Sequence, residues 1–316
     1  MNKQLKIIDL NKDIKDYNPK VICLGNFDGL HLGHMTLMDE NIRISKEYSL
    51  SSAVLFFNKN TKEILRNQHG YLTSLEDKIE IASERSIEYF CIINFDKALL
   101  NLKPEEFIKD ILIDKLNVKY IVVGEDFRFG YKALGDVNLL KKLEDKYNYK
   151  VKIMPLKLLH DKKINSTKIR EYITSGNIKK ANKQLGYNYK IKGIVIGGQQ
   201  RGRKLGFPTA NLKMKFDYVL PKNGVYFTKV YIDYKQYYAM TDIGTNPSFE
   251  NKEIKIETYI FNFNKDIYQK DMAIEFIEYI REDIKFDDIN ALIKQIQADK
   301  KVIEEKINQI DKNKEL

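Results

Sequence analysis

The sequence predicts a parallel α/β domain at residues 1–185 followed by an antiparallel β domain at residues 186–316. The first observation is length, because 316 residues are about twice the roughly 150 residues of an average domain. The second is that short apolar runs alternate with amphipathic stretches before Gly186, which is typical of a parallel sheet covered by helices. The third is that the runs after Gly186 are β-rich and are separated by Gly, Asn and Asp, which favours antiparallel strands.

The individual elements follow from these patterns in chain order. Apolar runs predict buried strands in the first half at residues 21–25, 53–57, 90–94, 120–124 and 151–154. Residues 74–87 and 104–116 carry apolar side chains at three- and four-residue spacing and begin with Ser or Pro, which predicts helices over the sheet. Residues 166–185 predict two short helices between the domains. The second half predicts strands at residues 189–196, 224–232, 236–243 and 254–261. It predicts one C-terminal helix at residues 287–310.

The composition is that of a soluble globular protein. With 43% hydrophobic and 31% charged residues, it excludes collagen-like, low-complexity and wholly disordered classes. No apolar run approaches the ~18 residues that span a bilayer, and the first residues lack the apolar block of a secretory signal. Cys23 and Cys91 each lie inside an apolar run. We therefore expect free thiols, a cytoplasmic location and no membrane partner.

The charge balance leaves two interpretations of the partner. The chain has 54 basic and 44 acidic residues and a net charge of +10, which suits a polyanion such as nucleic acid. Lysines are nevertheless scattered among acidic residues, and no long basic run or basic-aromatic stripe is present, which favours solvated helix faces. We expect a small phosphorylated ligand rather than nucleic acid.

Two of the four histidines of the chain, His31 and His34, lie in the run GNFDGLHLGH at residues 25–34, directly after the first predicted strand. Glycines in such a run permit tight turns and close backbone approach, and the helix that follows offers free N–H groups to an anion. The imidazoles can donate hydrogen bonds to the oxygens of a phosphate under attack. This segment therefore predicts a phosphate site.

Two other interpretations of the histidine pair stay open. A zinc site needs further ligands, whereas His69 and His160 are isolated and neither cysteine belongs to a ligand pair. The two rings could also be satisfied in a turn without any ligand. A glycine-rich loop after a strand is weak by itself, because the dinucleotide fingerprint and the P-loop lysine pattern are both missing.

The run at residues 25–34 resembles the nucleotidyltransferase motif of the prokaryotic bifunctional riboflavin kinase/FAD synthetases. Three later stretches match in order, at residues 72–81, 122–130 and 165–170. The resemblance implies a Rossmann-like nucleotidyltransferase domain with a parallel sheet that adenylylates FMN. It further implies an antiparallel β-barrel riboflavin kinase domain with a C-terminal helix.

The resemblance also implies which residues of the first domain bind. It assigns His31 and His34 to the phosphates of ATP and Asp126 to the vicinity of nucleotide and flavin. Ser166, Thr167 and Arg170 would hold the triphosphate; hydroxyls at a helix start followed by an arginine one turn later suit an anion, although Ser-Thr there is also an ordinary helix cap. The other expected nucleotide-contacting residues of the loop are Gly25, Phe27, Asp28, Gly29 and Gly33.

The chain departs from the family after the second predicted strand. Relatives usually carry an Asp-Pro-His-Pro turn there, whereas this chain reads Asn58-Lys59-Asn60-Thr61, and the usual first Ser of the later motif is Asn165. The altered turn could reshape FMN binding or weaken adenylyl transfer. A riboflavin kinase with a degenerate first domain is therefore an alternative, and a basic nucleic-acid-binding regulator is a more remote one.

The β domain contains a second candidate phosphate site at residues 197–211, which hold four glycines and three cations before a Pro-Thr-Ala-Asn sequence. A glycine-rich backbone can wrap a nucleotide, although a basic surface loop would look similar. Thr209 and Asn211 are two residues apart on one strand face, and their neutral oxygens suit Mg²⁺ bridged to phosphates. The expected nucleotide-binding residues of this segment are Gly197, Gly202, Arg203, Gly206 and Pro208.

This stretch resembles the riboflavin kinase signature, as do residues 242–249 and 256–259. The resemblance makes Glu257 the catalytic base, in an alternating apolar strand where a carboxylate is costly unless it is functional or paired; a surface glutamate is the other interpretation. Tyr259 replaces the usual histidine and Glu250 the usual glycine. The predicted function is ATP- and Mg²⁺-dependent phosphorylation of riboflavin to FMN, then adenylylation of FMN to FAD. The oligomeric state is left open.

Overall fold

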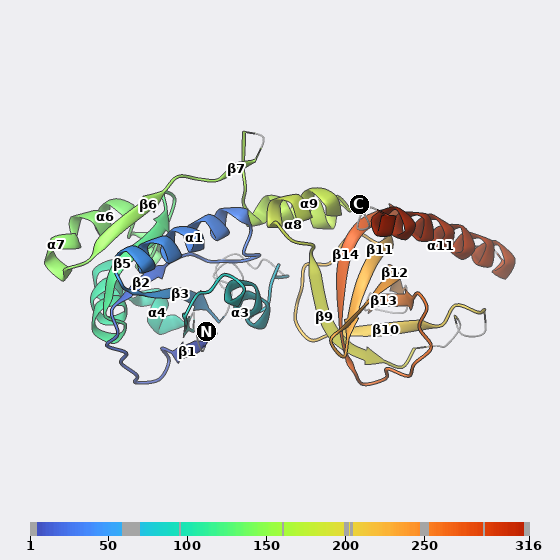
Figure 1. Ribbon diagram of the computed structural model, residues 1–316, viewed down its shortest axis with the longest axis horizontal. Coiled ribbons are helices and arrows are strands. Elements are labelled where there is room, and N and C mark those ends of the chain that lie inside the picture. Colours follow the sequence, from blue (N-terminus) through green and yellow to red (C-terminus); the bar gives the residue numbers. More distant parts are fainter. Residues whose placement is uncertain are drawn as a thin grey trace. The chain divides into compact units, whose positions relative to one another are not determined.

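The chain forms two compact units, Met1–Ser166 and Thr167–Leu316, in the computed structural model (Figure 1). We call them unit 1 and unit 2 and describe each by itself. The boundary between the units falls after the first residue of α8 (Ser166–Thr174), and α9 (Ile178–Leu185) follows in unit 2. The functional boundary expected at residue 185 therefore stays a prediction. The structure describes residues 5–58, 70–94, 96–159, 161–198, 202, 205–246, 253–286 and 288–312.

Unit 1 is built on a six-stranded parallel sheet with the order β1-β4-β3-β2-β5-β6. The strands are β1 (Lys6–Asp9), β2 (Lys20–Cys23), β3 (Ser51–Phe57), β4 (Tyr89–Ile93), β5 (Val118–Gly124) and β6 (Lys150–Met154). The five strands predicted from apolar runs are confirmed. β1 escapes that criterion because it is a four-residue edge strand with its first two side chains exposed.

Both faces of this sheet are buried, which explains why its strands are continuous apolar runs rather than alternating ones. Val21 and Cys23 of β2 pack in the apolar layer under α1 and α3, whereas Ile22 and Leu24 pack in the opposite layer. The helical segments of unit 1 are α1 (Leu32–Glu47), α3 (Leu75–Ser83), α4 (Lys97–Asn101), α5 (Pro104–Glu106), a π-helix (Phe107–Lys115), a 3-10 turn (Tyr131–Ala133), α6 (Val137–Lys142) and α7 (Glu144–Tyr147).

Two predicted helices differ from the structure in detail. The helix expected at residues 74–87 ends at Ser83, and Ser86 takes a left-handed φ of 64°. The helix expected at residues 104–116 is a short α-helical turn continued by a π-helix. Apolar spacing predicts which residues face the sheet and does not distinguish between hydrogen bonds to the fourth and to the fifth residue.

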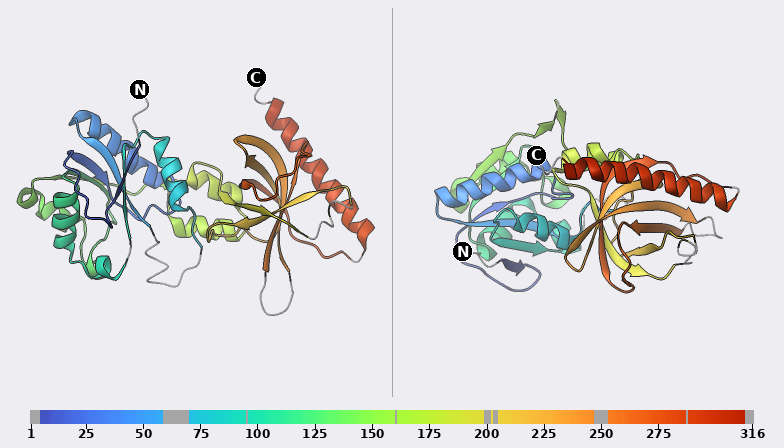
Figure 2. Two further views of the ribbon diagram at one scale, coloured as in Figure 1. Left: turned by 90° about the horizontal axis from the view of Figure 1, so that it is seen from below. Right: turned by 45° about the vertical axis from the view of Figure 1, so that its right-hand side comes forward.

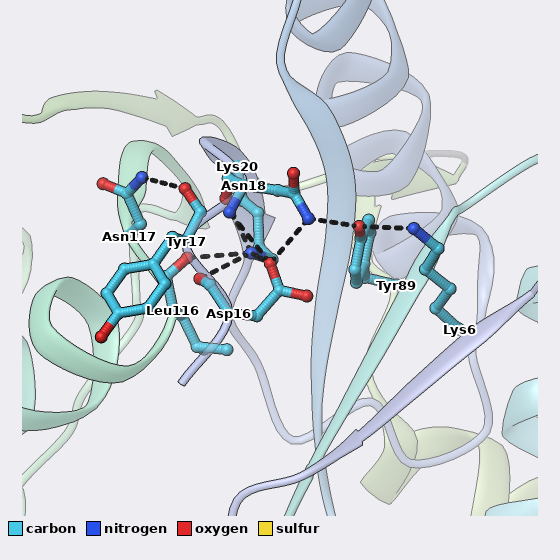
Figure 3. Close-up of polar contacts among 8 residues, drawn as sticks. All are labelled: Lys6, Asp16, Tyr17, Asn18, Lys20, Tyr89, Leu116 and Asn117. Carbon is cyan, nitrogen blue, oxygen red and sulfur yellow. Dashed lines mark hydrogen bonds and ion pairs between the residues drawn. The ribbon is translucent and has the colours of Figure 1, made fainter. Parts of the chain in front are cut away.

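A fully buried lysine joins the strands at the amino end of the same sheet (Figure 3). Lys20 Nζ donates to Asp16 Oδ1 at 2.8 Å, to the Asn18 carbonyl at 2.7 Å and to the Leu116 carbonyl at 3.1 Å. The ammonium also lies 5.0 Å from the Tyr89 ring centroid. Because every donor of the ammonium has an acceptor, this lysine is fully satisfied and belongs to the scaffold.

Unit 2 contains a closed antiparallel barrel with the order β10-β13-β12-β11-β14-β9. Its strands are β9 (Lys190–Ile196), β10 (Thr209–Met214), β11 (Gly224–Ile232), β12 (Lys235–Asn246), β13 (Glu253–Ile260) and β14 (Asp271–Arg281). The four predicted strands of the β domain are confirmed. β10 has no predicted range, although Thr209 and Asn211 were expected on one strand face, and β14 is absent from the prediction. β14 closes the barrel by pairing with β9 and β11.

The C-terminal helix α11 (Ile289–Lys312) lies along the outside of the barrel, in red in Figure 2. Ile303 of α11 is fully buried against Val225 and Phe227 of β11 and Met240 of β12. The predicted C-terminal helix is confirmed, and Asp287, where it was expected to begin, lies outside the described residues. The outer barrel face beneath α11 is therefore a packed apolar layer, next to the buried ion pair between Arg281 of β14 and Asp299 of α11.

Candidate functional sites

The first candidate site is the loop that joins β2 to α1. The sheet order changes direction at β2, since β3, β4 and β1 lie on one side and β5 and β6 on the other. Ligands of open parallel sheets bind outside the carboxyl ends of the strands at such a point. The histidine loop follows β2 and the segment with Asp126 follows β5, so both lie at this edge of the sheet.

The backbone of this loop is held in an unusual conformation. Phe27 and Leu30 have φ values of 47° and 35°, and Gly29 has a φ of 83°. Left-handed backbone is costly for bulky residues other than glycine and persists only where the surroundings impose it. Both Phe27 and Leu30 are fully buried, so their side chains anchor the loop in this conformation.

The two histidines meet at the start of α1. Their rings stack with centroids 3.7 Å apart and an interplanar angle of 14°, and the Phe27 ring meets His34 edge-on at 5.2 Å. His31 is the N-cap of α1, and its Nδ1 accepts the backbone N–H of His34 at 3.4 Å. The predicted pair is therefore brought together at a helix N-terminus.

The protonation of His31 follows from its burial. Its side chain is 6% exposed, and burial lowers the pKa of the imidazole to about 4, against the opposing effect of Asp28. The ring is thus neutral at pH 7. Because Nδ1 accepts a hydrogen bond, the hydrogen of the neutral ring is on Nε2. His31 can therefore donate one hydrogen bond to a phosphate oxygen without competing as a base.

The other residues predicted for this site are placed as follows. Ser166 Oγ donates to the Asp28 carbonyl at 2.8 Å, which joins the later motif to the histidine loop. Asp126 Oδ2 accepts from Lys163 Nζ at 2.7 Å. Thr167 and Arg170 lie on α8 within unit 2, and their phosphate contacts stay predictions.

Lys163 is a candidate that sequence reasoning missed. It lies in β8 (Lys162–Lys163), which pairs with β7 (Leu158–Leu159). Besides its bond to Asp126, Lys163 is close enough to His31 to lower the pKa of that ring. The sequence signal was its position two residues before the Asn165 motif, but a single lysine among 54 basic residues does not stand out.

The altered turn after β3 is described only at its first residue. Asn58 Nδ2 donates to Asn94 Oδ1 at 3.0 Å, and the Asn58 N–H donates to the Ile93 carbonyl. Lys59, Asn60 and Thr61 lie outside the described residues. The same holds for the isolated His69 and His160, and the consequence of the altered turn stays open.

The second candidate site lies on one face of the barrel. Thr209 and Asn211 alternate along β10, and Asn211 is paired directly opposite Glu257 of β13. Alternate residues and directly opposed residues share a sheet face. The three oxygen-bearing side chains predicted for the kinase reaction are therefore on the same face, with Asn211 and Glu257 directly opposed and Thr209 diagonal to Glu257.

The glycine-rich segment approaches this face closely. A Cβ on Gly198 would lie 2.2 Å from Asn211 Nδ2, and a Cβ on Gly202 would lie 2.3 Å from the Phe207 carbonyl and 3.4 Å from Thr209 Oγ1. Gly206 has a φ of 83°, whereas Gly197 has open space around it. The backbone can thus approach Thr209 and Asn211, the two predicted metal ligands, only because glycine has no side chain.

A cavity of about 500 Å³ adjoins Thr209. Pro208, Thr209 and Ala210 form one wall, and residues 263–268 form another. A volume of this size is typical of small-ligand sites. Arg203, together with Arg201, Lys204 and residues 247–250, lies outside the described residues, so those predicted contacts stay predictions.

Asp242 is a second carboxylate beside Glu257. It is directly opposite Glu257 in the β12–β13 ladder, and its Oδ1 is buried without a hydrogen-bond partner among the described residues. Burial, followed by the charges of Asp283 and Glu257, raises its pKa to about 7. The chain therefore holds a carboxyl that changes charge near neutral pH next to the predicted base.

This shift predicts a pH dependence of stability. The folded state binds the Asp242 proton more tightly than the unfolded chain, whose ordinary pKa is 3.8. Its stabilising contribution is complete below about pH 4 and is lost as the pH rises through about 7. We expect Asp242→Asn to melt progressively higher than the wild type as the pH rises from 5 to 8. Parallel melting curves across that range would remove Asp242 as the cause.

No group of three or more His, Cys, Asp and Glu side chains in the described ranges could hold a metal ion. None of the helices described is both long and apolar enough to span a bilayer. Cys23 and Cys91 are free and buried.

Comparisons with known proteins agree on both halves of the chain. The family model for FAD synthetase matches residues 13–168, and that for riboflavin kinase matches residues 185–307. A bifunctional riboflavin kinase/FMN adenylyltransferase of Buchnera aphidicola (subspecies Acyrthosiphon pisum) is 38% identical over 98% of this chain and 100% of its own. One of Listeria monocytogenes is 36% identical over 89% of this chain and 90% of its own.

A solved structure shares the architecture over nearly the whole chain. The crystal structure of a Streptococcus pneumoniae protein, described as a macrolide-efflux protein, has a TM-score of 0.87 and 32% identity. The match covers 95% of this chain and 99% of the other. The two family models and the bacterial relatives together show that this chain belongs to the family of bifunctional riboflavin kinase/FMN adenylyltransferases.

Proposed function

We propose that this chain phosphorylates riboflavin to FMN in the domain at residues 186–316 and adenylylates FMN to FAD in the domain at residues 1–185, using ATP in both steps. The observation that carries the proposal is that each compact unit has its own cluster of residue types that suit phosphate. Unit 1 has a histidine pair at a helix N-terminus beside the switch point of its sheet. Unit 2 has a carboxylate opposite an amide on the face that its glycine-rich segment approaches.

In the kinase step, Glu257 would accept the proton of the ribityl 5′-hydroxyl as that oxygen attacks the γ-phosphorus. The β10–β13 register supports this role, because Glu257 directly opposes Asn211 and lies one alternate position from Thr209. Gly198 and Gly202 lie close to Asn211 and Thr209, so their backbone would be able to approach the transferring phosphate.

The donor set on this face fits Mg²⁺. Thr209 and Asn211 provide neutral oxygens two residues apart on one face, and hard oxygen donors suit a cation that keeps phosphate oxygens and water as its other ligands. Bound Mg²⁺ would neutralise charge on the phosphates during transfer. Thr209 and Asn211 would hold it, and the close approach of Gly198 to Asn211 would keep that amide in place.

In the adenylylation step, the FMN phosphate would attack the α-phosphorus of ATP and pyrophosphate would leave. This nucleophile is already anionic, so no protein base is needed, and catalysis would come from alignment and charge stabilisation. Neutral His31 suits that task, because its Nε2–H donates and its lowered pKa keeps it from taking a proton. His34, Ser166, Thr167 and Arg170 are the further expected donors.

The finer assignments are part of the same proposal. Riboflavin, FMN and ATP are the partners, the location is the cytoplasm, and the functional domains divide at residue 185. The two family models support this division, because one ends at residue 168 and the other begins at residue 185. The β7–β8 hairpin and the Asn165 motif would then both serve the first domain.

Incubation of the pure protein with riboflavin, ATP and Mg²⁺, followed by separation of the flavins, tests the proposal. We expect FMN to appear first and FAD to follow. A degenerate first domain would give FMN only, and supplying FMN and ATP would then release no pyrophosphate. No phosphorylated flavin at all would refute the proposed function.

A further inference from the structure

The helices α8 and α9 carry part of the segment proposed for adenylylation, yet they pack with the barrel in unit 2 (Figure 1). Thr167 and Arg170, two of the expected phosphate donors, lie on α8. The family model for FAD synthetase ends at residue 168 and that for riboflavin kinase begins at residue 185, so residues 169–184 lie between the two matches. The position of Thr167 and Arg170 therefore depends on what holds these two helices on the barrel.

Both helices are docked through an apolar stripe. Its members recur at three- and four-residue spacing within each helix and are at most 1% exposed: Ile169 and Ile173 of α8, then Ile178, Ala181 and Leu185 of α9. Burial of such a stripe supplies most of the stability of a packed helix. Apolar contacts are non-directional, however, and do not by themselves fix a helix along its axis. Directional contacts must fix its position.

The side-chain amide of Asn182 supplies three such contacts between α9 and the barrel. Its Nδ2 donates to the Phe276 carbonyl of β14 and to Asn188 Oδ1, both at 2.9 Å. Its Oδ1 accepts the Tyr189 N–H at 2.9 Å, directly before β9. Phe276 and Tyr189 are fully buried. Both donors of the amide and its oxygen are thus used, so α9 is bonded to β14 and to the segment that enters β9 at the same point.

A short turn carries this placement from α9 to α8. The Asn177 N–H donates to the Tyr172 carbonyl at 2.7 Å, and the Gly176 N–H donates to the Ile173 carbonyl at 3.0 Å. Gly176 has a φ of 80°, which a side chain would make costly. Because the turn is tight and bonded, the direction of α8 follows from the seat of α9.

Two weaker contacts support the same docking. The Lys222 N–H donates to the Ile173 carbonyl of α8 at 3.2 Å. Lys179 Nζ of α9 lies 2.9 Å from Glu278 Oε1 of β14. The lysine of that ion pair is largely exposed, and exposed ion pairs contribute little stability. The amide of Asn182 is therefore the side chain with the largest share in fixing the helix pair.

We propose that Asn182 is a positioning residue for adenylyl transfer: by bonding α9 to the barrel it holds α8, and with it Thr167 and Arg170, in the position in which they bind the triphosphate of ATP. The inference rests on the proposed function of the domain at residues 1–185. Asn182 touches no substrate and acts through α8. The barrel thus supports adenylylation structurally, in addition to its own transfer reaction.

The test compares Asn182→Ala and Asn188→Ala in the full chain. We expect Asn182→Ala to raise the KM for ATP in FMN adenylylation by about 5- to 50-fold, because three buried hydrogen bonds are lost. The KM for FMN should stay unchanged, since the expected contacts of Thr167 and Arg170 are with the triphosphate. Asn188→Ala leaves the bond to Phe276 in place and should raise the KM for ATP less. Amide hydrogen exchange in α8 should be faster in the same order.

Two controls separate this role from general damage. Riboflavin phosphorylation should be unchanged in Asn182→Ala and reports an intact barrel. Asn308→Ala makes the same chemical change at an exposed position of α11, the other helix packed on the barrel. It should change neither the KM for ATP nor the hydrogen exchange of α8.

Each outcome supports or overturns the proposal. A wild-type KM for ATP in folded Asn182→Ala would overturn it, whatever the hydrogen exchange of α8. So would an equal loss of both reactions, because that result indicates damage to the barrel as a whole. If Asn182→Ala does not fold, Asn188→Ala and Lys179→Met decide, and a wild-type KM for ATP in both overturns the proposal. Failure of the wild type to form FAD would refute the proposed function instead.

Discussion

Glu257→Gln should lower riboflavin phosphorylation by about 10²- to 10⁴-fold, the range typical for loss of a general base, while FMN adenylylation persists. Glutamine keeps the shape of the side chain opposite Asn211 in the β10–β13 ladder but cannot accept the hydroxyl proton. The measurement is the initial rate of FMN formation from riboflavin and ATP, with FAD formation from supplied FMN followed in parallel.

The control for this substitution is Glu304→Gln, which makes the same chemical change on an exposed position of α11. It should leave both rates unchanged. A kinase rate in Glu257→Gln equal to that of the wild type would remove Glu257 from the mechanism. Asp242, which directly opposes Glu257, would then be the next carboxyl to examine on this face.

His31→Ala should have the opposite effect, lowering FMN adenylylation by about 10²-fold or more and leaving riboflavin phosphorylation intact. Alanine removes the Nε2–H donor and also the N-cap acceptor for the His34 N–H. The N-terminus of α1 therefore loses both a hydrogen-bond donor to phosphate and its cap. The rate of pyrophosphate release from FMN and ATP measures the effect.

Comparable damage to both reactions in a folded His31→Ala protein would contradict the separate assignment of the two sites. His31→Gln is a useful companion, because an amide can replace one hydrogen bond at a time. It should recover part of the activity if donation to phosphate is the main role of the ring. A stability effect alone would appear in the melting temperature and not in the rate of the folded fraction.

Much of the fold could be predicted because buried strands appear in the sequence as apolar runs. The sheet of unit 1 is covered on both faces, so its central strands are uninterrupted apolar runs such as residues 53–57. β1, β10 and β14 had no predicted range because their side chains are partly exposed. Their pairing is decided by distant partners, such as β4 for β1 and β9 and β11 for β14. The π-helix at Phe107–Lys115 was missed because its apolar spacing is that of an ordinary helix.

The candidate sites likewise contain residues that could be predicted from the sequence and residues that could not. The histidine pair could be predicted because its two members are three residues apart, and the structure stacks them. Lys163 and Asp242 could not, since each gains its place from a tertiary contact or from strand register rather than from a local motif. Lys163 depends on Asp126, which lies 37 positions earlier in the chain. Asp242 depends on its cross-strand pairing with Glu257.

The central claim is that one chain carries two independent transfer sites. Mixing two variants, each of which lacks a different one of the two activities, tests it most directly. Glu257→Gln and His31→Ala are each incubated alone with riboflavin, ATP and Mg²⁺, and then together. We expect little FMN or FAD from the first alone, FMN without FAD from the second alone, and FAD from the mixture as released FMN passes between chains. FAD formation by either variant alone at the wild-type rate, or a mixture that yields none although supplied FMN is adenylylated by Glu257→Gln, would contradict the account.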